Sequence, residues 1–166
     1  MRHQFCLKRK DQKTAILFIG LPGSGKSTFI HNHVTSAGDG SQYTIVDADK
    51  IKETHPDYDP NNTEKVHEWS VKQAEEEMNR LSDEGKDICM DSGGVNNSYS
   101  LRIINMLKSK DYFIILIHMN TPLDICLERN SKRERKVPEE AIIKKSLKIN
   151  ECVEKQKVLA NAFFTF

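Results

Sequence analysis

Residues 20–28 read Gly-Leu-Pro-Gly-Ser-Gly-Lys-Ser-Thr, the full pattern G-x-x-x-x-G-K-[ST] of a phosphate-binding loop. The pattern predicts a phosphate site only where a β-strand precedes it and an α-helix follows it. Residues 14–19 form an apolar, β-rich run that is typical of a buried parallel strand. After the loop, Phe29, Ile30 and Val34 have the spacing of an apolar helix face. The sequence therefore predicts a strand, loop and helix that bind the phosphates of a nucleotide.

Each residue type in this loop has a physical role in binding phosphate. Gly23 and Gly25 lack a Cβ, so the backbone can adopt unusual angles and approach the anion closely. The amides would then point at the phosphates, beside the positive end of the following helix. We expect Lys26 to reach the outer phosphates and the Ser27 hydroxyl to bind Mg²⁺, so the expected cofactors are ATP and Mg²⁺. The residues of the loop expected to bind the nucleotide are Gly20, Pro22, Gly23, Ser24, Gly25, Lys26, Ser27 and Thr28.

The length and the charge of the chain limit the number of domains and the kinds of partner to be expected. The chain has 166 residues, enough for one domain with a sizeable core. Its 25 Lys and Arg against 24 Asp and Glu give a formal net charge of +1, so the total charge favours no particular partner. The basic residues gather instead in a tail over 1–13 and in the segment 129–136. Nothing in the sequence indicates an oligomeric state.

The four cysteines indicate neither a metal site nor a redox site, because none of them has C-x-x-C spacing. Cys89 and Cys126 lie in apolar stretches and are expected in the core. The charged N-terminus has no hydrophobic segment of a signal peptide, and no apolar run reaches the length of a membrane span. We therefore expect a reduced, cytoplasmic protein without a membrane partner.

Strand-like and helix-like segments alternate along the chain. Strands are expected at 14–20, 43–46, 88–90 and 112–117, and helices at about 26–35, 63–82, 123–129 and from Pro138 onward. A further helix is expected to be capped by Ser98 or Ser100. The end at 162–166 is either a last short strand or a partner-binding segment. This alternation predicts an α/β, three-layer P-loop NTPase fold with a parallel sheet of about four to five strands and helices on both faces.

Carboxylates follow two of the predicted strands. In such sheets, ligands bind beyond the carboxyl ends of the strands. Asp49 follows the second strand, where a kinase needs a carboxylate to orient the acceptor hydroxyl and accept its proton. Asp47 is nearer the strand and suits a capping or supporting role, and capping of the next helix by both aspartates is the structural alternative. Asp91 ends the third strand, where a carboxylate would hold Mg²⁺ through water or contact the acceptor, unless it is an ordinary turn residue.

The segment 129–136 reads Arg-Asn-Ser-Lys-Arg-Glu-Arg-Lys and lies between two predicted helices, after the fourth strand. Arginines stabilise the charge of a transferring phosphoryl group and contribute on the order of 10³–10⁵ in rate. A basic segment in this position is expected to be a mobile lid over ATP, at about 129–137. A solvated run of charges is the alternative.

These motifs together resemble the phage polynucleotide 5′-kinase domain and, more widely, the zeta-toxin-like small P-loop kinases. The resemblance covers roughly residues 14–150 and implies a P-loop kinase domain over 14–160. It implies that Asp49 is the general base and that Lys26 acts on the phosphates. It also implies that Arg133 is the lid arginine that stabilises the transferring phosphoryl group, and that Arg129 is a nearby ATP contact.

Other parts of the resemblance concern the acceptor. Asp91 and Ser92 match a pair near the acceptor, so both are expected to bind substrate. Lys52 stands where the family has an arginine near the phosphates, which keeps the charge but loses the bidentate fork. Glu134 replaces a glycine that often follows the lid arginine, and the His-Pro-Asp-Tyr of 55–58 looks more like the zeta-toxin branch. These departures leave the kinase chemistry intact and the acceptor open.

Several functions are compatible with this sequence. The leading one is an ATP-dependent kinase that phosphorylates a hydroxyl of nucleic acid, above all a polynucleotide 5′-OH. Alternatives are a kinase for a hydroxymethylated base in phage DNA, a kinase for a small molecule such as a nucleoside or nucleotide-sugar, and a nucleotide-binding switch or ATPase. Asp49 and the basic lid argue against a switch, which needs neither. Tyr58, Trp69 and Tyr99 are candidates for stacking on a base, although the spacing of Trp69 favours the core.

Overall fold

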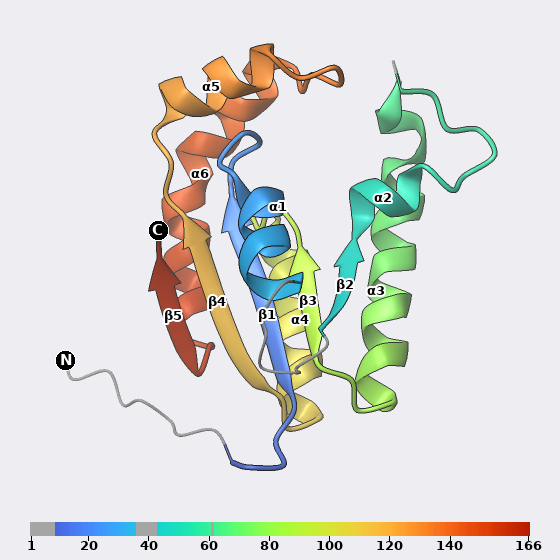
Figure 1. Ribbon diagram of the computed structural model, residues 1–166, viewed down its shortest axis with the longest axis vertical. Helices are drawn as coiled ribbons and strands as arrows, with labels where there is room; N and C mark the ends of the chain where they lie inside the picture. The colour runs from blue at the N-terminus through green and yellow to red at the C-terminus, as the bar shows by residue number, and fades with distance from the viewer. Residues whose placement is uncertain (1–8, 36–42, 61) are drawn as a thin grey trace.

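The protein was analysed as a computed structural model, which describes residues 9–35, 43–60 and 62–166. These residues form a five-stranded parallel sheet in the order β2-β3-β1-β4-β5, with helices on both faces (Figure 1). The strands are β1 Thr14–Gly20, β2 Thr44–Asp47, β3 Ile88–Asp91, β4 Phe113–Met119 and β5 Ala162–Thr165. The predicted three-layer P-loop NTPase fold is confirmed.

β1 lies at the centre of the sheet, and all seven of its residues are buried, as expected for a strand covered on both faces. Ile16 stands opposite Cys89 of β3 on one side and Ile115 of β4 on the other. The Phe-rich end of the chain joins the sheet as β5, parallel to β4, with Phe163 opposite Leu116. Of the two alternatives for this segment, the short strand is correct for 162–165.

Two layers of helices cover the sheet. On one face, α1 (Lys26–Phe29) continues as a π-helix, η1 (Ile30–Thr35), and Ile30 and Val34 pack against Phe18. The helices of the other face are α3 His67–Asp83, α4 Asn97–Ser109 and α6 Glu139–Lys157. The helix predicted at about 26–35 is therefore α-helical only in its first turn. In the last turn the Thr35 hydroxyl donates to the Ile30 carbonyl, a bond that spans the five residues of a π turn.

Side chains define the start of two helices. Asp47 caps α2 (Ala48–Lys52), because its Oδ1 accepts a hydrogen bond from the Asp49 amide at 2.8 Å. Asn96 caps α4 by accepting from the Tyr99 amide at 3.2 Å. The predicted cap at Ser98 or Ser100 is wrong, since both serines lie inside the helix. The remaining helices are the 3₁₀ helix η2 Thr63–Val66, which leads into α3, and α5 Leu123–Ser131.

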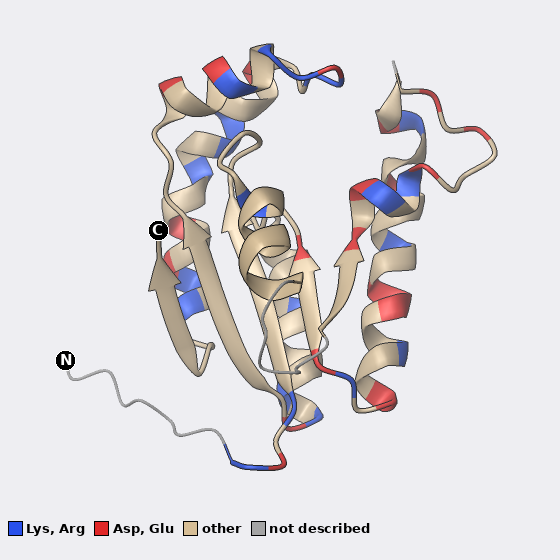
Figure 2. Ribbon diagram, in the orientation of Figure 1, with Lys and Arg blue, Asp and Glu red and all other residues tan. Residues whose placement is uncertain are grey.

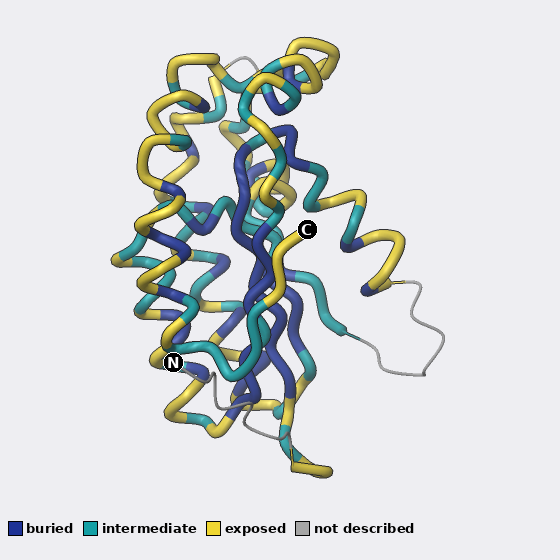
Figure 3. The backbone as a smooth tube through the Cα atoms, turned by 90° about the vertical axis from the view of Figure 1, so that its left-hand side faces the viewer, coloured by how far each residue is buried: buried dark blue, intermediate teal, exposed yellow. Residues whose placement is uncertain are grey.

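The fold brings the predicted site residues to one edge of the sheet. The P-loop, the start of α2 and the segment after β3 all follow the carboxyl ends of neighbouring strands, and α5 lies above the P-loop (Figure 1). The strands form a buried layer between exposed outer surfaces (Figure 3). No helix in the described part of the chain is both long and apolar enough to cross a membrane.

Candidate active site

Lys26 begins α1 and bends back over the P-loop. Its Nζ donates to the carbonyl oxygens of Gly20 at 2.9 Å and Leu21 at 3.0 Å. Burial lowers the pKa of Lys26 to about 8; the charge of Asp91 opposes this shift, and the charge of Arg133 adds to it. A desolvated ammonium that is held only by neutral oxygens would gain a strong, charge-assisted partner in a phosphate.

Two glycines shape the loop itself. Gly23 has a φ of +86° and Gly25 a φ of +93°, and both lie in the left-handed region that favours glycine. A Cβ at Gly23 would lie 2.4 Å from the Cys126 carbonyl oxygen, so α5 packs directly on the loop there. At Gly25 the nearest atom is Arg129 Nη1, 3.7 Å away. The loop therefore leaves space at Gly25, beside a guanidinium, which fits the phosphates of ATP.

Ser27 and Asp91 form the candidate metal site. The Ser27 hydroxyl donates to Asp91 Oδ2 at 2.7 Å. Asp47 stands opposite Asp91 in the sheet register, and desolvation together with the charge of Asp91 raises the pKa of Asp47. Hydroxyl and carboxylate oxygens are ligands that Mg²⁺ prefers. The residues present thus fit Mg²⁺, which Ser27 and Asp91 would hold.

Asp49 lies in the first turn of α2 and faces the lid segment. Its Oδ1 accepts hydrogen bonds from Lys52 Nζ at 3.1 Å and from Arg135 Nη2 at 3.4 Å. The Asp49 side chain is 67% exposed, whereas the Lys52 side chain is 6% exposed. Partial desolvation raises the pKa of Asp49, but the charges and hydrogen bonds of Lys52 and Arg135 outweigh it and bring the pKa below its ordinary value. Asp49 is therefore an accessible carboxylate held by two cations.

The base of the predicted lid is closed by Asn130. Its Nδ2 donates to the Val137 carbonyl at 2.8 Å, and its Oδ1 accepts from the Val137 amide at 3.0 Å. Because Asn130 is buried, this pair of bonds fixes both ends of the loop between α5 and α6. α5 extends to Ser131, so the predicted segment at about 129–137 is helical at its start and a loop after that.

The lid arginines differ in what they contact. Arg129 stands on α5, and its Nη1 donates to the Gly23 carbonyl at 3.4 Å. Arg133 is exposed and lies close enough to Lys26 for its charge to lower the pKa of that lysine. Arg135 is the lid residue that touches Asp49. The structure thus brings both predicted arginines to the P-loop and adds Arg135 at the candidate base.

Two other residues that were predicted to contact the substrate, Ser92 and Tyr99, make contacts within the protein. The Ser92 hydroxyl donates to the Phe18 carbonyl of β1 at 3.3 Å, so its predicted role at the acceptor stays a prediction. Tyr99 packs against the hydrophobic core, with the Arg102 guanidinium carbon 5.7 Å from its ring centroid. Its ring is therefore not a free surface for stacking on a base.

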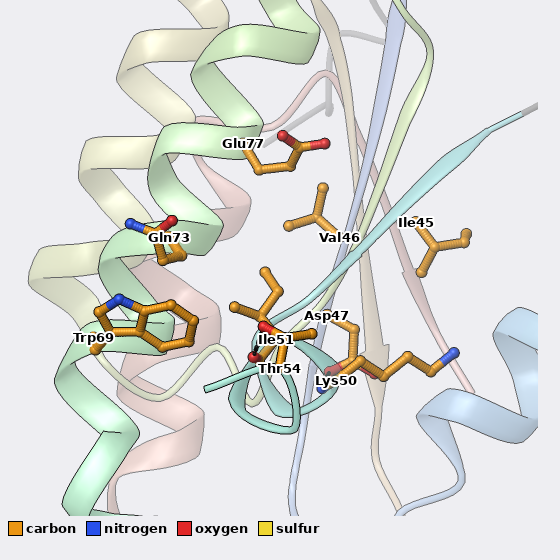
Figure 4. A pocket seen from close by; sticks show the side chains of 9 residues that line it. All are labelled: Ile45, Val46, Asp47, Lys50, Ile51, Thr54, Trp69, Gln73 and Glu77. Atoms are coloured by element: carbon orange, nitrogen blue, oxygen red, sulfur yellow. Dashed lines mark hydrogen bonds between the residues drawn. The ribbon is translucent and has the colours of Figure 1, made fainter. Parts of the chain in front are cut away.

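A pocket of about 460 Å³ lies between β2, α2 and α3 (Figure 4). Trp69 is only partly buried and lines this pocket, with its ring 4.6 Å edge-on from His55, so the expectation that Trp69 lies in the core is wrong. Asp47 and Lys50 also line this pocket. Asp49 is not among the lining residues and instead accepts a hydrogen bond from Arg135 of the lid. The full lining is Ile45, Val46, Asp47, Lys50, Ile51, Thr54, Trp69, Gln73 and Glu77.

Sequence reasoning missed Asn130 as the clamp of the lid, Arg135 as the partner of Asp49, and Lys145. The charge of Lys145, on α6, lowers the pKa of both Lys26 and His67. The contacts of Arg135 and Asn130 depend on the path of the lid, which sequence spacing does not give.

The comparison with protein families matches one family to most of the chain. Its description is AAA domain, and it covers residues 16–148. The chain belongs to this AAA domain family of P-loop kinases. A protein similar to this chain is the L-seryl-tRNA(Sec) kinase of Methanococcus maripaludis, which is 28% identical over 131 residues, or 76% of this chain and 49% of the relative. Toxin zeta of Streptococcus agalactiae is 28% identical over 119 residues, or 68% of this chain and 41% of the relative. The chain thus spans less than half of the length of these two relatives.

Solved structures share the architecture of this chain. A structure from the PezAT chromosomal toxin-antitoxin system of Streptococcus pneumoniae has a TM-score of 0.74 at 21% identity, covering 95% of this chain and 70% of that one. A structure of the Pnkp1/Rnl/Hen1 RNA repair complex has a TM-score of 0.62 at 20% identity, covering 87% of this chain and 46% of that one. At these identities the similarity establishes the fold of this AAA domain protein.

Proposed function

We propose that this AAA domain protein is an ATP-dependent kinase that transfers the γ-phosphoryl group to a hydroxyl of nucleic acid, with a polynucleotide 5′-OH as the leading acceptor. The observation that carries the proposal is the contact between Asp49 and the lid. The accessible Asp49 carboxylate lies 3.4 Å from Arg135 Nη2. The charge of Arg133, on the same lid, lowers the pKa of Lys26 in the P-loop. A nucleotide switch needs neither this carboxylate nor these arginines.

In the proposed reaction the acceptor oxygen attacks the γ-phosphorus of ATP. The bond between that phosphorus and the β–γ bridging oxygen breaks, and ADP leaves with the electron pair. Asp49 orients the acceptor hydroxyl and accepts its proton. Lys26 and Arg133 stabilise the charge on the γ-phosphoryl oxygens. Mg²⁺, when bound, neutralises phosphate charge.

The lowered pKa of Asp49 is compatible with this role. In a loose transition state the bond to the leaving group breaks early, and the acceptor hydroxyl loses its proton late. A carboxylate that is a weak base but holds the hydroxyl in line then contributes mainly through position. The contacts from Lys52 and Arg135 keep Asp49 ionised and turned toward the lid.

Exposure and charge favour a nucleic acid acceptor over a small one. Asp49 is open enough to receive the end of a polymer, and Lys and Arg residues lie on α2, the lid and α6 (Figure 2). The name of the seryl-tRNA(Sec) kinase gives it a substrate that contains an RNA, which supports a nucleic acid substrate here. The similarity to toxin zeta keeps a nucleotide-sugar or nucleoside as the second candidate.

Transfer of label from γ-labelled ATP to a panel of acceptors tests the proposal. The panel holds 5′-OH DNA and RNA oligonucleotides, DNA with hydroxymethyluracil, nucleosides and UDP-N-acetylglucosamine. Label on the 5′ end of an oligonucleotide is the expected result. Label confined to an internal base or to a small molecule would move the function to the corresponding alternative. ATP hydrolysis without a labelled acceptor would contradict the kinase proposal.

A further inference from the structure

We propose that the pocket between β2, α2 and α3 binds a nucleobase that carries an exocyclic amino group (Figure 4). None of the described lining residues belongs to the P-loop, the lid or α5, so the ligand is not the triphosphate of ATP. The volume of about 460 Å³ is typical of small-molecule sites, which span roughly 300–1,000 Å³. The inference goes beyond the proposed function, because it concerns binding and requires no phosphoryl transfer.

The first argument is that the pocket lies at a free edge of the sheet. β2 is an outer strand, and its Thr44 amide donates to the Asp87 carbonyl, on the side of β3, at 2.9 Å. Successive residues of a strand turn their backbone groups alternately toward the partner strand and away from it, so the N–H and C=O of Ile45 face away from β3. In the described part of the chain, neither group has a hydrogen-bond partner.

Ile45 lines the pocket, although its side chain packs with the cluster around Phe18 on the other face of the sheet and points away from α3 (Figure 4). The part of Ile45 that faces the pocket is therefore its backbone. This backbone offers a hydrogen-bond donor and an acceptor side by side, as it would to a neighbouring strand.

The second argument is that one wall of the pocket suits a planar ring. Trp69, Gln73 and Glu77 follow one another at intervals of four residues on α3, so they share a face of the helix, and all three line the pocket. The Trp69 ring is partly buried, and His55 lies edge-on against it with the ring centroids 4.6 Å apart. Ile51 of α2 adds an aliphatic surface to the lining. A nucleobase that enters beside Trp69 can stack on the indole.

The third argument is that the polar groups of this wall are acceptors. Gln73 Nε2 donates to Glu76 at 2.8 Å, which leaves the amide oxygen of Gln73 for a ligand. The two oxygens of Glu77 accept from Arg80 at 2.9 and 2.6 Å, and these bonds hold the pKa of Glu77 below its ordinary value. Each oxygen keeps a lone pair. An exocyclic amino group supplies the donors that such oxygens need, and the ring nitrogen beside it can accept from the N–H of Ile45.

The charge of the lining disfavours a phosphate in the pocket. Asp47 and Glu77 bring two carboxylates, and Lys50, the cation of the described lining, points away from α3 (Figure 4). A phosphate would therefore face like charges, whereas a neutral base does not. A base of this kind can come from a free nucleoside or from the end of a nucleic acid, and the two sources are separated below by experiment.

The fluorescence of Trp69, the only tryptophan of the chain, reports directly on the pocket. Titration with adenosine, cytidine and guanosine should quench it, because the base stacks on the indole. Uridine has no amino group and should bind about tenfold more weakly, the loss of a hydrogen bond to a charged acceptor. Unchanged fluorescence with every nucleoside would overturn the inference, and equally tight binding of uridine would overturn the assignment of the amino group.

Equilibrium dialysis of labelled cytidine against variants gives a second readout. We expect Trp69→Ala to weaken binding about tenfold or more, the loss of one stacked aromatic, and Trp69→Phe to keep most of it. Glu77→Gln, which keeps the shape of the side chain, should weaken cytidine about tenfold and leave uridine unchanged. Glu68→Ala, an exposed neighbour of Trp69 outside the lining, is the control. Unaltered Kd values in both Trp69→Ala and Glu77→Gln would contradict the inference.

Two oligothymidylates with a 5′-OH identify the source of the base: one ends in a 5′ cytosine and the other in a 5′ abasic residue. Tighter binding of the first, with the difference lost in Trp69→Ala, would assign the base to the end of a nucleic acid. Equal binding of both, with quenching by free cytidine, would assign it to a nucleoside. These experiments contain no ATP. Quenching without any phosphoryl transfer would refute only the proposed function, and transfer with unchanged Trp69 fluorescence would refute only this inference.

Discussion

Arg135 Nη2 lies 3.4 Å from Asp49 Oδ1, although the two residues are 86 positions apart in the sequence. The same oxygen accepts a hydrogen bond from Lys52. One cation therefore comes from the helix of the candidate base and the other from the lid. This arrangement couples the ionisation of Asp49 to the position of the lid, because a lid that moves away removes one of the charges that lower the pKa of Asp49.

Arg135→Ala should move the acid limb of the pH profile of kcat/KM to higher pH. Lys52 and Arg135 hold the pKa of Asp49 below its ordinary value, so in the unaltered protein the carboxylate stays ionised as the pH falls. Without Arg135 that pKa rises, and kcat/KM should begin to fall at a higher pH. Because Asp49 is largely exposed, salt should reduce the difference. Lys132→Ala, which removes a lid cation that pairs with Glu128 instead, is the control; an acid limb that stays in place in Arg135→Ala would refute the coupling.

Lys26→Met should change how stability depends on pH. The pKa of Lys26 is about 8 in the folded protein, against 10.5 for an ordinary lysine. The unfolded chain thus binds this proton more tightly, so the charged amine costs stability below pH 8, and the cost disappears as the pH rises toward the ordinary value. The gain in urea-unfolding free energy of Lys26→Met should be larger at about pH 7 than at about pH 10. An equal difference at both pH values would contradict the burial of a charged Lys26.

Gly23→Ala should damage the P-loop more than Gly25→Ala. Both glycines have a positive φ, so each substitution strains the backbone by roughly 1–3 kcal/mol. Only at Gly23 would the new Cβ also collide with backbone, at 2.4 Å from the Cys126 carbonyl oxygen. Thermal unfolding and nucleotide binding should both show the larger loss in Gly23→Ala. Equal losses would mean that α5 does not support the loop in this way.

Arg133→Ala should lower turnover more than it lowers ATP affinity. Its proposed partner is the charge that builds on the transferring phosphoryl group, and arginines in this role contribute on the order of 10³–10⁵ in rate. We expect kcat to fall by at least about a hundredfold with a similar Kd for ATP. Lys136→Ala, another exposed lid cation, serves as the matched variant. An unchanged kcat in Arg133→Ala would remove that residue from the mechanism.

The sequence predicted the elements that depend on local pattern. The apolar run of β1 and the P-loop after it determine the central strand and the start of α1, and the three-layer sheet follows from the alternation of segments. Local competition explains the errors. Asn96, and not Ser98 or Ser100, caps α4 because it is the last residue before helical geometry begins. Trp69 has the spacing of a core residue, but the edge of the sheet at β2 leaves its ring partly uncovered.

The candidate site could be predicted only where it depends on the strand ends. Lys26, Ser27, Asp49 and Asp91 follow from the rule that ligands bind at the carboxyl ends of parallel strands. The lid contacts do not, because they are set by how far α5 extends and by the bonds of Asn130 to Val137. Arg135 is one of several cations in its segment, and no spacing rule distinguishes the one that reaches Asp49.

The measurement that tests the central claim most directly compares Asp49→Asn with the unaltered protein. Both are given γ-labelled ATP and a 5′-OH oligonucleotide, and ATP binding is measured on the same samples. We predict equal Kd values for ATP and at least about a hundredfold slower labelling of the 5′ end by Asp49→Asn, because the amide neither accepts the proton nor keeps the charge that Lys52 and Arg135 hold in position. Equal labelling rates in the two proteins would contradict the account, since Asp49 would then have no part in the transfer.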